Sequence, residues 1–276
     1  PFIIHSIPSR ISELIDIKRD YTNCNALTAF KHFSFKFNAQ CQSSALWERQ
    51  QCCDAPLTTR IANNDLCHMP EKSILITGCS SGIGLCVARG LKSLGYRVFA
   101  TARKVHDVHQ LEADGFESLQ LDLADSDSIA AAVDEILART GGTLDALFNN
   151  GAYGQPGAVE DLSRDVLRAQ FETNLFGWHE LTNRVLPAMR RQGHGRIVQN
   201  SSVLGFVALR YRGAYNASKY ALEGLSDTLR LELAGTDIHV SLVEPGPVTS
   251  RFRENAFRAY QENIDPDSSV HRDRYL

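Results

Sequence analysis

The chain has no dense run of lysine or arginine, no long apolar stretch and no Cys-x-x-Cys pair among its 276 residues. A nucleic-acid partner is not expected, because such proteins concentrate positive charge on one face and this chain has a formal net charge of -3. No apolar run approaches the roughly 20 residues that span a bilayer, so no transmembrane segment is expected. Residues 1–30 also lack the basic start, apolar core and small-residue cleavage site of a secretory signal. These absences together predict a cytoplasmic protein.

Cysteine is distributed unevenly, with five of the seven residues in the first 68 positions. Cys52-Cys53 and Cys67-His68 are the pairs that a zinc site could use, but adjacent cysteines chelate one ion awkwardly. His106 and His109 are three positions apart and lack a third ligand. We therefore expect no metal, and we interpret the cysteines as free thiols of a reducing compartment.

The first 68 residues carry no sustained period of 3.6 or of two residues, so we assign no domain there. Met69 stands just ahead of the first apolar run, where a dinucleotide-binding domain usually begins. We expect residues 1–68 to be an irregular extension from outside the native coding sequence, the alternative being a genuine extension. Residues 69–276 are then the single folded domain.

From residue 73 onward, short apolar strands alternate with helical patterns, which is typical of a parallel sheet covered on both faces. The predicted strands span 73–77, 96–101, 118–121, 145–149, 195–200 and 238–243. The predicted helices span 82–94, 105–113, 126–140, 164–192 and 215–234. The expected fold class is α/β with a doubly wound parallel sheet, a Rossmann fold. Ligands of such sheets bind beyond the carboxyl ends of the strands, where the strand order reverses.

A glycine-rich turn, Thr77-Gly78-Cys79-Ser80-Ser81-Gly82-Ile83-Gly84, directly follows the first predicted strand. Glycines permit backbone angles closed to other residues and let the main chain approach a pyrophosphate, whose charge the amides at a helix N-terminus meet. The turn alone is weak evidence. Downstream, Tyr215 is the only tyrosine followed four positions later by lysine, Lys219. The two features together point to a hydride-transfer enzyme.

Tyrosine needs help to act as an acid or base at neutral pH, because its free pKa is about 10. Lys219 lies one helical turn from Tyr215 on the same predicted face. Its charge, together with that of an oxidised nicotinamide, is expected to lower the pKa of Tyr215.

The chain resembles the short-chain dehydrogenase/reductase family over roughly residues 70–250. The resemblance rests on the Gly-x-x-x-Gly-x-Gly spacing of the turn, on Asn149-Asn150-Gly151-Ala152, on Tyr215 with Lys219, and on Pro245-Gly246-Pro247-Val248-Thr249. The family commonly has Asn-Asn-Ala-Gly, so glycine and alanine have exchanged places here. The cofactor-binding residues that the resemblance implies are Thr77, Gly78, Ser80, Ser81, Gly82, Ile83, Gly84, Arg103, Asp122, Leu123, Asn150, Gly151, Tyr215, Lys219, Pro245, Gly246, Val248 and Thr249. Asp122, Leu123 and Asn150 would flank the adenine, whereas Val248 and Thr249 would border the nicotinamide.

The end of the second strand favours NADP over NAD. An NAD site usually carries Asp or Glu here for the ribose 2′-hydroxyl, but this chain reads Ala100-Thr101-Ala102-Arg103-Lys104. The fork of Arg103 suits a 2′-phosphate, with Ser80 as a neutral donor. The alternative is that Arg103 is a solvated surface charge.

The resemblance also implies four catalytic residues, Asn174, Ser202, Tyr215 and Lys219. Ser202 precedes Tyr215 by 13 positions, the usual separation in the family, and would polarise the substrate oxygen; Ser201 is the alternative. Asn174 would bend the long fourth helix and bind a water that links Lys219 to solvent. Its alternative is a buried polar residue without a catalytic role.

The motifs are most similar to the steroid and retinol dehydrogenase branch and its bacterial relatives, which implies a lipophilic alcohol, aldehyde or ketone, steroid or retinoid-like, as substrate. Residues 251–276 are polar and too short for the lid, helix and seventh strand of the family, so the C-terminal substrate region is expected to be truncated.

Two functions stay open. One is an active NADP-dependent oxidoreductase, and the other is an incompetent fragment that binds nucleotide or a protein partner without turnover. Sugar-nucleotide epimerase chemistry would need a longer C-terminal domain and a different glycine turn. Helices 164–192 and 215–234 have wide apolar faces, and the family resemblance implies that these form the interface of a homodimer or homotetramer; the alternative is that they simply cover the sheet.

Overall fold

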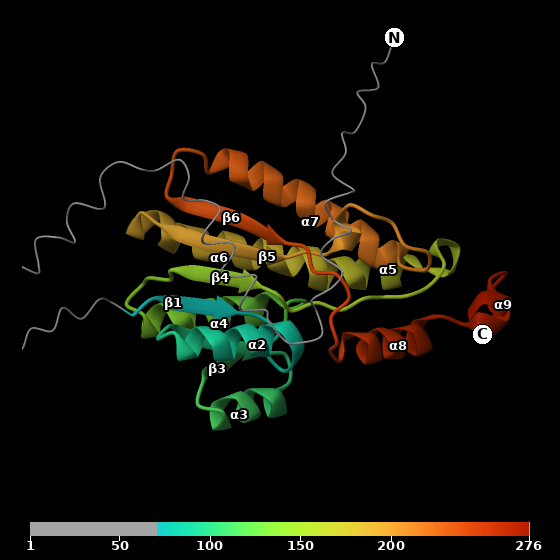
Figure 1. Ribbon diagram of the computed structural model, residues 1–276, viewed down its shortest axis with the longest axis horizontal. Helices are drawn as coiled ribbons and strands as arrows, with labels where there is room; N and C mark the ends of the chain where they lie inside the picture. The colour runs from blue at the N-terminus through green and yellow to red at the C-terminus, as the bar shows by residue number, and fades with distance from the viewer. Residues whose placement is uncertain (1–70, 276) are drawn as a thin grey trace, which may run out of the picture. The chain divides into compact units, whose positions relative to one another are not determined.

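A six-stranded parallel sheet is the centre of the part of the chain that the computed structural model describes, residues 71–275. Its strands are β1 (Ser73–Ile76), β2 (Arg97–Ala102), β3 (Glu117–Gln120), β4 (Ala146–Asn149), β5 (Gly195–Asn200) and β6 (Ile238–Val243). They lie in the order β3-β2-β1-β4-β5-β6, and Figure 1 shows β6, β5, β4 and β1 in this sequence from the top of the view. The order reverses between β1 and β4. The predicted doubly wound α/β fold is confirmed.

The helices are α2 (Gly82–Ser93), α3 (Val105–Ala113), α4 (Ser126–Arg139), α5 (Arg164–Phe171), α6 (Gly177–Gln192), α7 (Gly213–Glu232), α8 (Phe252–Asn263) and α9 (Arg272–Tyr275). They create two cores, one on each face of the sheet. Leu75 of β1 belongs to the core under α4, α6 and α7, while its neighbours Ile74 and Ile76 belong to the core under α2 and α3. Burial on both faces explains why β1 reads as a continuous apolar run.

One predicted helix, 164–192, is interrupted in the structure. A five-residue π-helical segment, Glu172–Phe176, separates α5 from α6. The helical pattern of the sequence does not reveal it, because the wider turn serves one side chain: Asn174 is fully buried and bonds the backbone of Tyr153 instead of facing solvent. Such segments are frequent at functional sites.

The polar segment 251–275, for which no elements were predicted, folds into α8, a 3-10 turn (Pro266–Ser268) and α9. The helical period is hard to detect in the sequence, since α8 buries only the small side chains Ala256 and Ala259. The sheet has no seventh strand among the described residues.

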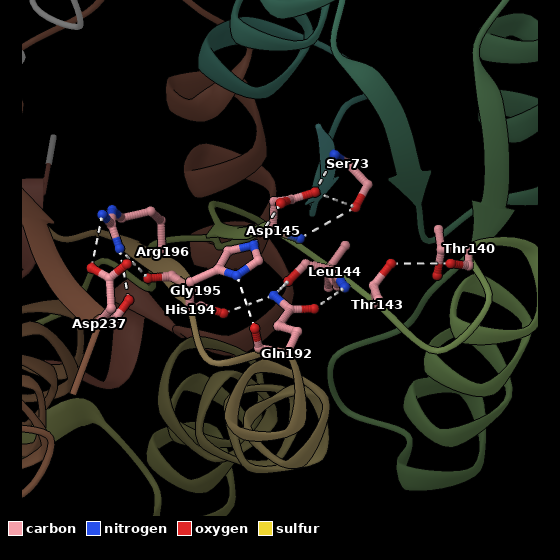
Figure 2. A network of polar contacts seen from close by, with 10 residues as sticks. All are labelled: Ser73, Thr140, Thr143, Leu144, Asp145, Gln192, His194, Gly195, Arg196 and Asp237. Atoms are coloured by element: carbon pink, nitrogen blue, oxygen red, sulfur yellow. Dashed lines mark hydrogen bonds and ion pairs between the residues drawn. The ribbon is translucent and has the colours of Figure 1, made fainter. Parts of the chain in front are cut away.

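The amino ends of β1, β4 and β5 are tied together by one polar network (Figure 2). Asp145 accepts hydrogen bonds from the amide of Ser73 (2.8 Å) and its hydroxyl (3.1 Å), and its other oxygen lies 2.9 Å from His194 Nε2. Aspartate stands between serine and histidine, so the histidine cannot take the serine proton, and the cluster lies at the sheet edge opposite the ligand-binding edge. We therefore assign it a structural role.

The expected absences of a metal site and of a transmembrane segment can be compared only with the described residues. Within residues 71–275 no group of three or more His, Cys, Asp or Glu could hold a metal ion, and no helix is long and apolar enough to cross a bilayer. The extension 1–68, with Cys52-Cys53 and Cys67-His68, lies outside the described residues.

Candidate active site

The glycine turn lies at the carboxyl end of β1, and its glycines are required for different reasons. Gly78 and Gly82 have φ values of 70° and 61°, which side chains rarely adopt. A side chain on Gly78 would come within 2.6 Å of the backbone of Gly151, and one on Gly84 within 2.5 Å of the Gly78 carbonyl oxygen. On Gly82 it would meet only Ser250 within 4 Å. The turn is therefore tight on its inner side and open at Gly82.

The turn leaves the first amides of α2 without a side-chain cap. Ser81 holds the N-cap position in an extended conformation, and its side chain makes no capping hydrogen bond. No acidic residue lies in the first turn of α2. Uncapped amides at a helix N-terminus attract anions, so the segment from Ser80 to Ile83 fits a diphosphate.

Thr77 and Asn150 join the carboxyl ends of β1 and β4. The Thr77 hydroxyl accepts hydrogen bonds from the amides of Asn150 (2.8 Å) and Gly151 (2.9 Å). Asn150 Nδ2 donates to the Thr77 carbonyl (2.9 Å), and Asn200 Nδ2 donates to Asn150 Oδ1 (2.8 Å). These hydrogen bonds fix the carboxyl ends of β1, β4 and β5 relative to one another, and a direct contact of Asn150 with a ligand stays a prediction.

Arg103, predicted to bind the 2′-phosphate, follows β2, and Asp122 and Leu123, predicted to flank the adenine, follow β3. Arg103 is exposed, and its charge opposes the rise that burial causes in the pKa of Tyr153, so the guanidinium lies near enough to act on that tyrosine. Asp122 accepts a hydrogen bond from the amide two residues on (3.0 Å), which shapes the turn after β3. Leu123 is buried, and its Cδ1 lies 3.1 Å from where a side chain on Gly151 would begin. The exchanged glycine at 151 therefore matches a tight space.

Tyr215 and Lys219 lie one turn apart on α7, and both reach the end of β5. Lys219 Nζ donates to the carbonyl oxygen of Asn200 (2.8 Å). It also lies 4.2 Å from the ring centroid of Trp178 and 5.6 Å from that of Tyr215. Cations are attracted to aromatic faces, so Trp178 supports the buried ammonium from α6.

Burial lowers the pKa of Lys219 to about 7, against the opposing charge of Glu223. Near neutral pH, protonated and neutral Lys219 are therefore both populated in the chain without ligand. The lysine is 1% exposed, so its proton has to pass through neighbouring groups.

In the chain without ligand, the pKa of Tyr215 lies above its usual value. Burial raises it, and the hydrogen bond with Ser202 opposes the rise without reversing it. Burial opposes ionisation because it removes the phenolate from water, and the lowering expected from Lys219 together with an oxidised nicotinamide stays a prediction. Ser202, rather than Ser201, is the serine brought to Tyr215; the Ser201 hydroxyl donates to Glu223.

Asn174 occupies the middle of the π-helical segment. Its Nδ2 donates to the carbonyl oxygen of Tyr153 (2.8 Å), and its Oδ1 accepts from the amide of Tyr153 (3.2 Å). Its Nδ2 also lies 3.5 Å from Ser218 Oγ on α7. The structure thus places Asn174 beside the Tyr215 helix, and its participation in proton transfer stays a prediction.

The segment after β6 contacts both the glycine turn and Tyr215. Arg251 Nη2 donates to the carbonyl oxygen of Ser80 (2.7 Å). The ring of Phe252, the next residue, lies edge-on to that of Tyr215 with centroids 5.6 Å apart. The carbonyl oxygen of Pro245 accepts from the amide of Val203 (3.3 Å) and anchors the start of the segment.

The predicted nicotinamide-side residues are open to solvent in this segment. Gly246, Val248 and Thr249 are exposed, and Pro245 is half-buried. Ser250, rather than Thr249, packs against Gly82 of the glycine turn. The contacts of Ser250, Arg251 and Phe252 escaped the sequence reasoning, because it stopped at the Pro-Gly motif and read the residues beyond only as polar.

Two buried glutamines, Gln155 and Gln170, attach α8 to the loop after β4. Gln155 Nε2 donates to the carbonyl oxygen of Ala259 (3.3 Å), and Asn263 Nδ2 donates to Gln155 Oε1 (3.0 Å). Gln170 of α5 accepts from the amide of Gln155 (2.7 Å). The segment 251–263 is thus fastened to the loop after β4, at the side of the site where Tyr215 lies.

Comparison with known proteins places this site in a family. A family model described as short chain dehydrogenase matches residues 72–261. An uncharacterized oxidoreductase of Escherichia coli K12, YbbO, is 49% identical over 185 residues, which are 67% of this chain and 69% of that protein. Bovine retinol dehydrogenase 8 is 39% identical over 220 residues, covering 74% of this chain and 70% of the relative.

Two solved structures share the fold. A short chain dehydrogenase/reductase from Burkholderia phymatum, in complex with NAD, superimposes with a TM-score of 0.64 at 27% identity, covering 71% of this chain and 72% of its own. A variant actinorhodin polyketide ketoreductase with NADPH gives a TM-score of 0.64 at 32% identity, covering 74% and 80%. The matched residues include the glycine turn, α7 and most of α8, and the chain therefore belongs to the short-chain dehydrogenase/reductase family of oxidoreductases.

Proposed function

We propose that the chain is an NADP-dependent oxidoreductase that interconverts a lipophilic alcohol and its carbonyl compound, with Tyr215 as the acid and base. The observation that carries the proposal is the arrangement on α7. Tyr215 is hydrogen-bonded to Ser202, and Lys219 is buried beside it on the Asn200 carbonyl. No purely structural need explains an ammonium that is buried at such a cost.

The glycine turn supports a dinucleotide at the edge of β1 and β4. The uncapped amides of α2 suit the diphosphate. Gly78 has no side chain, so the backbones of Gly78 and Gly151 lie close together at this edge of the sheet. When bound, the nicotinamide would donate or accept the hydride. Arg251, on the Ser80 carbonyl, brings a cation to the same turn.

The preference for NADP rests on Arg103. No carboxylate stands at this position after β2. The charge of Arg103 opposes the rise that burial causes in the pKa of Tyr153, so the guanidinium lies on the side of Tyr153. A guanidinium binds a phosphate in a charge-assisted, two-pronged fashion, whereas a 2′-hydroxyl gains little from it. One structural relative was solved with NAD and another with NADPH, so membership of the family does not give the cofactor by itself, and the proposed preference rests on Arg103.

The protein groups divide the proton chemistry. In the reducing direction Tyr215 donates its proton to the carbonyl oxygen, while Ser202 donates a hydrogen bond to the same oxygen. Lys219 stabilises the resulting phenolate, because a cation nearby lowers the cost of a buried negative charge. Asn174 lies beside the helix of the lysine, at 3.5 Å from Ser218, where a water could link the two to solvent. Oxidation is the reverse.

The lipophilic substrate class is supported by the walls near Tyr215. Phe252 covers one side of the tyrosine ring. Phe206 and Val207, in the loop that Asn216 Nδ2 holds through the Val207 carbonyl (2.8 Å), are 48% and 53% exposed beside the start of α7. Exposed apolar side chains gathered at a site favour an apolar ligand. The name of the retinol dehydrogenase relative agrees with this class.

A titration with NADPH and NADH, followed by turnover at 340 nm, tests the proposal. We expect tighter binding of NADPH, and its consumption with lipophilic aldehydes or ketones such as retinal and keto-steroids. Binding without consumption across this panel would instead support the second function, a nucleotide-binding protein without turnover. Absence of binding would overturn both.

A further inference from the structure

Glu223 continues the row of Tyr215 and Lys219 on α7. The three residues are spaced by four, so they lie on one face of the helix over two turns. Glu223 lies four positions after Lys219. It has no role in the proton transfer proposed above.

The three side chains reach three consecutive residues at the end of β5. Lys219 bonds the carbonyl of Asn200, Glu223 accepts from the hydroxyl of Ser201, and Tyr215 is hydrogen-bonded to Ser202. Ser201 itself is 2% exposed and stands between the two residues that touch the lysine and the tyrosine. Three contacts therefore attach α7 to the end of β5, and the contact between Glu223 and Ser201 is the middle one, here called the middle tie.

The turn after β5 closes over this middle tie. A side chain on Gly205 would lie 2.8 Å from Glu223 Oε1 and 2.9 Å from Ser201 Oγ. The Ser202 hydroxyl caps the same turn by accepting from the amide of Leu204 (3.1 Å). A shift of Ser201 would thus move the backbone that orients Ser202.

The charges around Glu223 come from two elements. On α7 these are Lys219, whose pKa the carboxylate supports, and further along Asp227 and Arg230. From the segment after β6 comes Glu244, whose pKa is raised by burial and then by the charge of Glu223. Lys219 is the cation that gains from this carboxylate, because burial otherwise removes its charge.

We propose that Glu223 is a positioning residue of the reaction: its carboxylate holds Ser201, which fixes the Asn200–Ser202 backbone against Tyr215 and Lys219, and its charge favours the protonated form of Lys219. The inference rests on the proposed function for its kinetic consequences, whereas its structural part stands on the contacts alone.

The variants Glu223→Gln, Glu223→Ala and Ser201→Ala separate the two parts. Glu223→Ala and Ser201→Ala each remove the tie, so we expect kcat to fall about 10- to 100-fold while the Kd of NADPH and the KM stay within about twofold. The double variant should lose no more than Glu223→Ala alone, because the contact that Ser201→Ala removes is already absent there. Glu223→Gln keeps an acceptor and loses the charge. It should retain most of kcat, but its oxidation profile should move about one unit to higher pH, since a less charged Lys219 stabilises the Tyr215 phenolate less.

Asp227→Asn is the matched control, because it removes one negative charge one turn further along the same helix. We expect it to leave kcat and the pH profile unchanged. Additive losses in the double variant, or an equal pH shift in Asp227→Asn and Glu223→Gln, would overturn the proposal. Amide hydrogen exchange of residues 195–212 adds a readout without turnover: it should be faster in Glu223→Ala than in the unchanged chain. If the chain consumes no cofactor, the proposed function fails, but the hydrogen-exchange result still tests whether Glu223 fixes the end of β5. Unchanged exchange in Glu223→Ala would contradict that role.

Discussion

Phe252 lies edge-on against Tyr215, with the two ring centroids 5.6 Å apart and the planes at 67°. The phenylalanine begins α8, while the tyrosine lies near the start of α7, 37 positions earlier in the chain. The contact keeps water from one side of the phenol. It therefore contributes to the burial that raises the pKa of Tyr215.

Replacing Phe252 with alanine should lower the pKa of Tyr215, because water then reaches the phenol and solvates its ionised form. Oxidation of an alcohol needs the ionised tyrosine, so the rising limb of its pH profile should move to lower pH, by about half a unit. Phe257→Ala is the control, since Phe257 is 59% exposed on the same helix. An unshifted limb in Phe252→Ala would show that the ring does not shield the tyrosine.

Arg103→Gln tests the cofactor preference. The variant loses a charge-assisted contact with the 2′-phosphate, so NADPH binding should weaken about 10- to 100-fold and NADH binding should change little. Fluorescence titration of both cofactors measures the ratio. Lys104→Gln, the neighbouring exposed cation, serves as the comparison. Equal weakening of NADPH and NADH binding would show that Arg103 contacts a group present in both cofactors and not the 2′-phosphate.

Two helix glycines should respond to alanine in opposite directions. A side chain on Gly177 would begin 1.9 Å from the carbonyl oxygen of Leu123, a clash with backbone that cannot move easily, so Gly177→Ala should lower the Tm. On Gly224 nothing lies within 4 Å, and alanine favours the helix by about 1 kcal/mol. Gly224→Ala should therefore raise the Tm. Thermal unfolding of both variants checks the pair, and equal shifts would contradict the close packing of α6 on the loop after β3.

Acid should destabilise the fold through Asp145. Burial alone would raise the pKa of its carboxyl, but the amide and hydroxyl of Ser73 and the ring of His194 outweigh burial and hold it below its usual value. A group with a lowered pKa in the folded state contributes stability above its unfolded pKa, near 3.9, and loses it as the pH falls through the folded value. Asp145→Asn should therefore show a shallower loss of unfolding free energy between about pH 5 and pH 2 than the unchanged chain. Urea unfolding over this range measures it, and parallel curves would remove Asp145 from the acid response.

The sheet and the glycine turn could be predicted from the sequence because they depend on local pattern. Apolar runs buried on both faces, such as Ile74 to Ile76, and glycines that need left-handed angles, such as Gly78, leave a direct trace in the residues. Tyr215 and Lys219 were recognisable because helical spacing brings them together.

The remaining features depend on contacts between distant segments. Arg251 meets Ser80 across 171 positions, and Glu223 meets Ser201 across 22, so neither contact shows as a period. The raised pKa of Tyr215 in the chain without ligand was not foreseen, because burial is a property of the packed site. The π-helical turn at Asn174 follows from its bonds to the Tyr153 backbone, which a helical pattern does not encode.

The most direct test of the central claim compares the unchanged chain with Tyr215→Phe, titrating both with NADPH and then following its consumption with a lipophilic aldehyde or ketone. The phenylalanine keeps the ring that packs on Phe252 and removes only the proton donor. We predict similar NADPH affinity in both proteins and a loss of turnover of at least about 100-fold in the variant. Turnover close to that of the unchanged chain would contradict the assignment of Tyr215 as the acid and base.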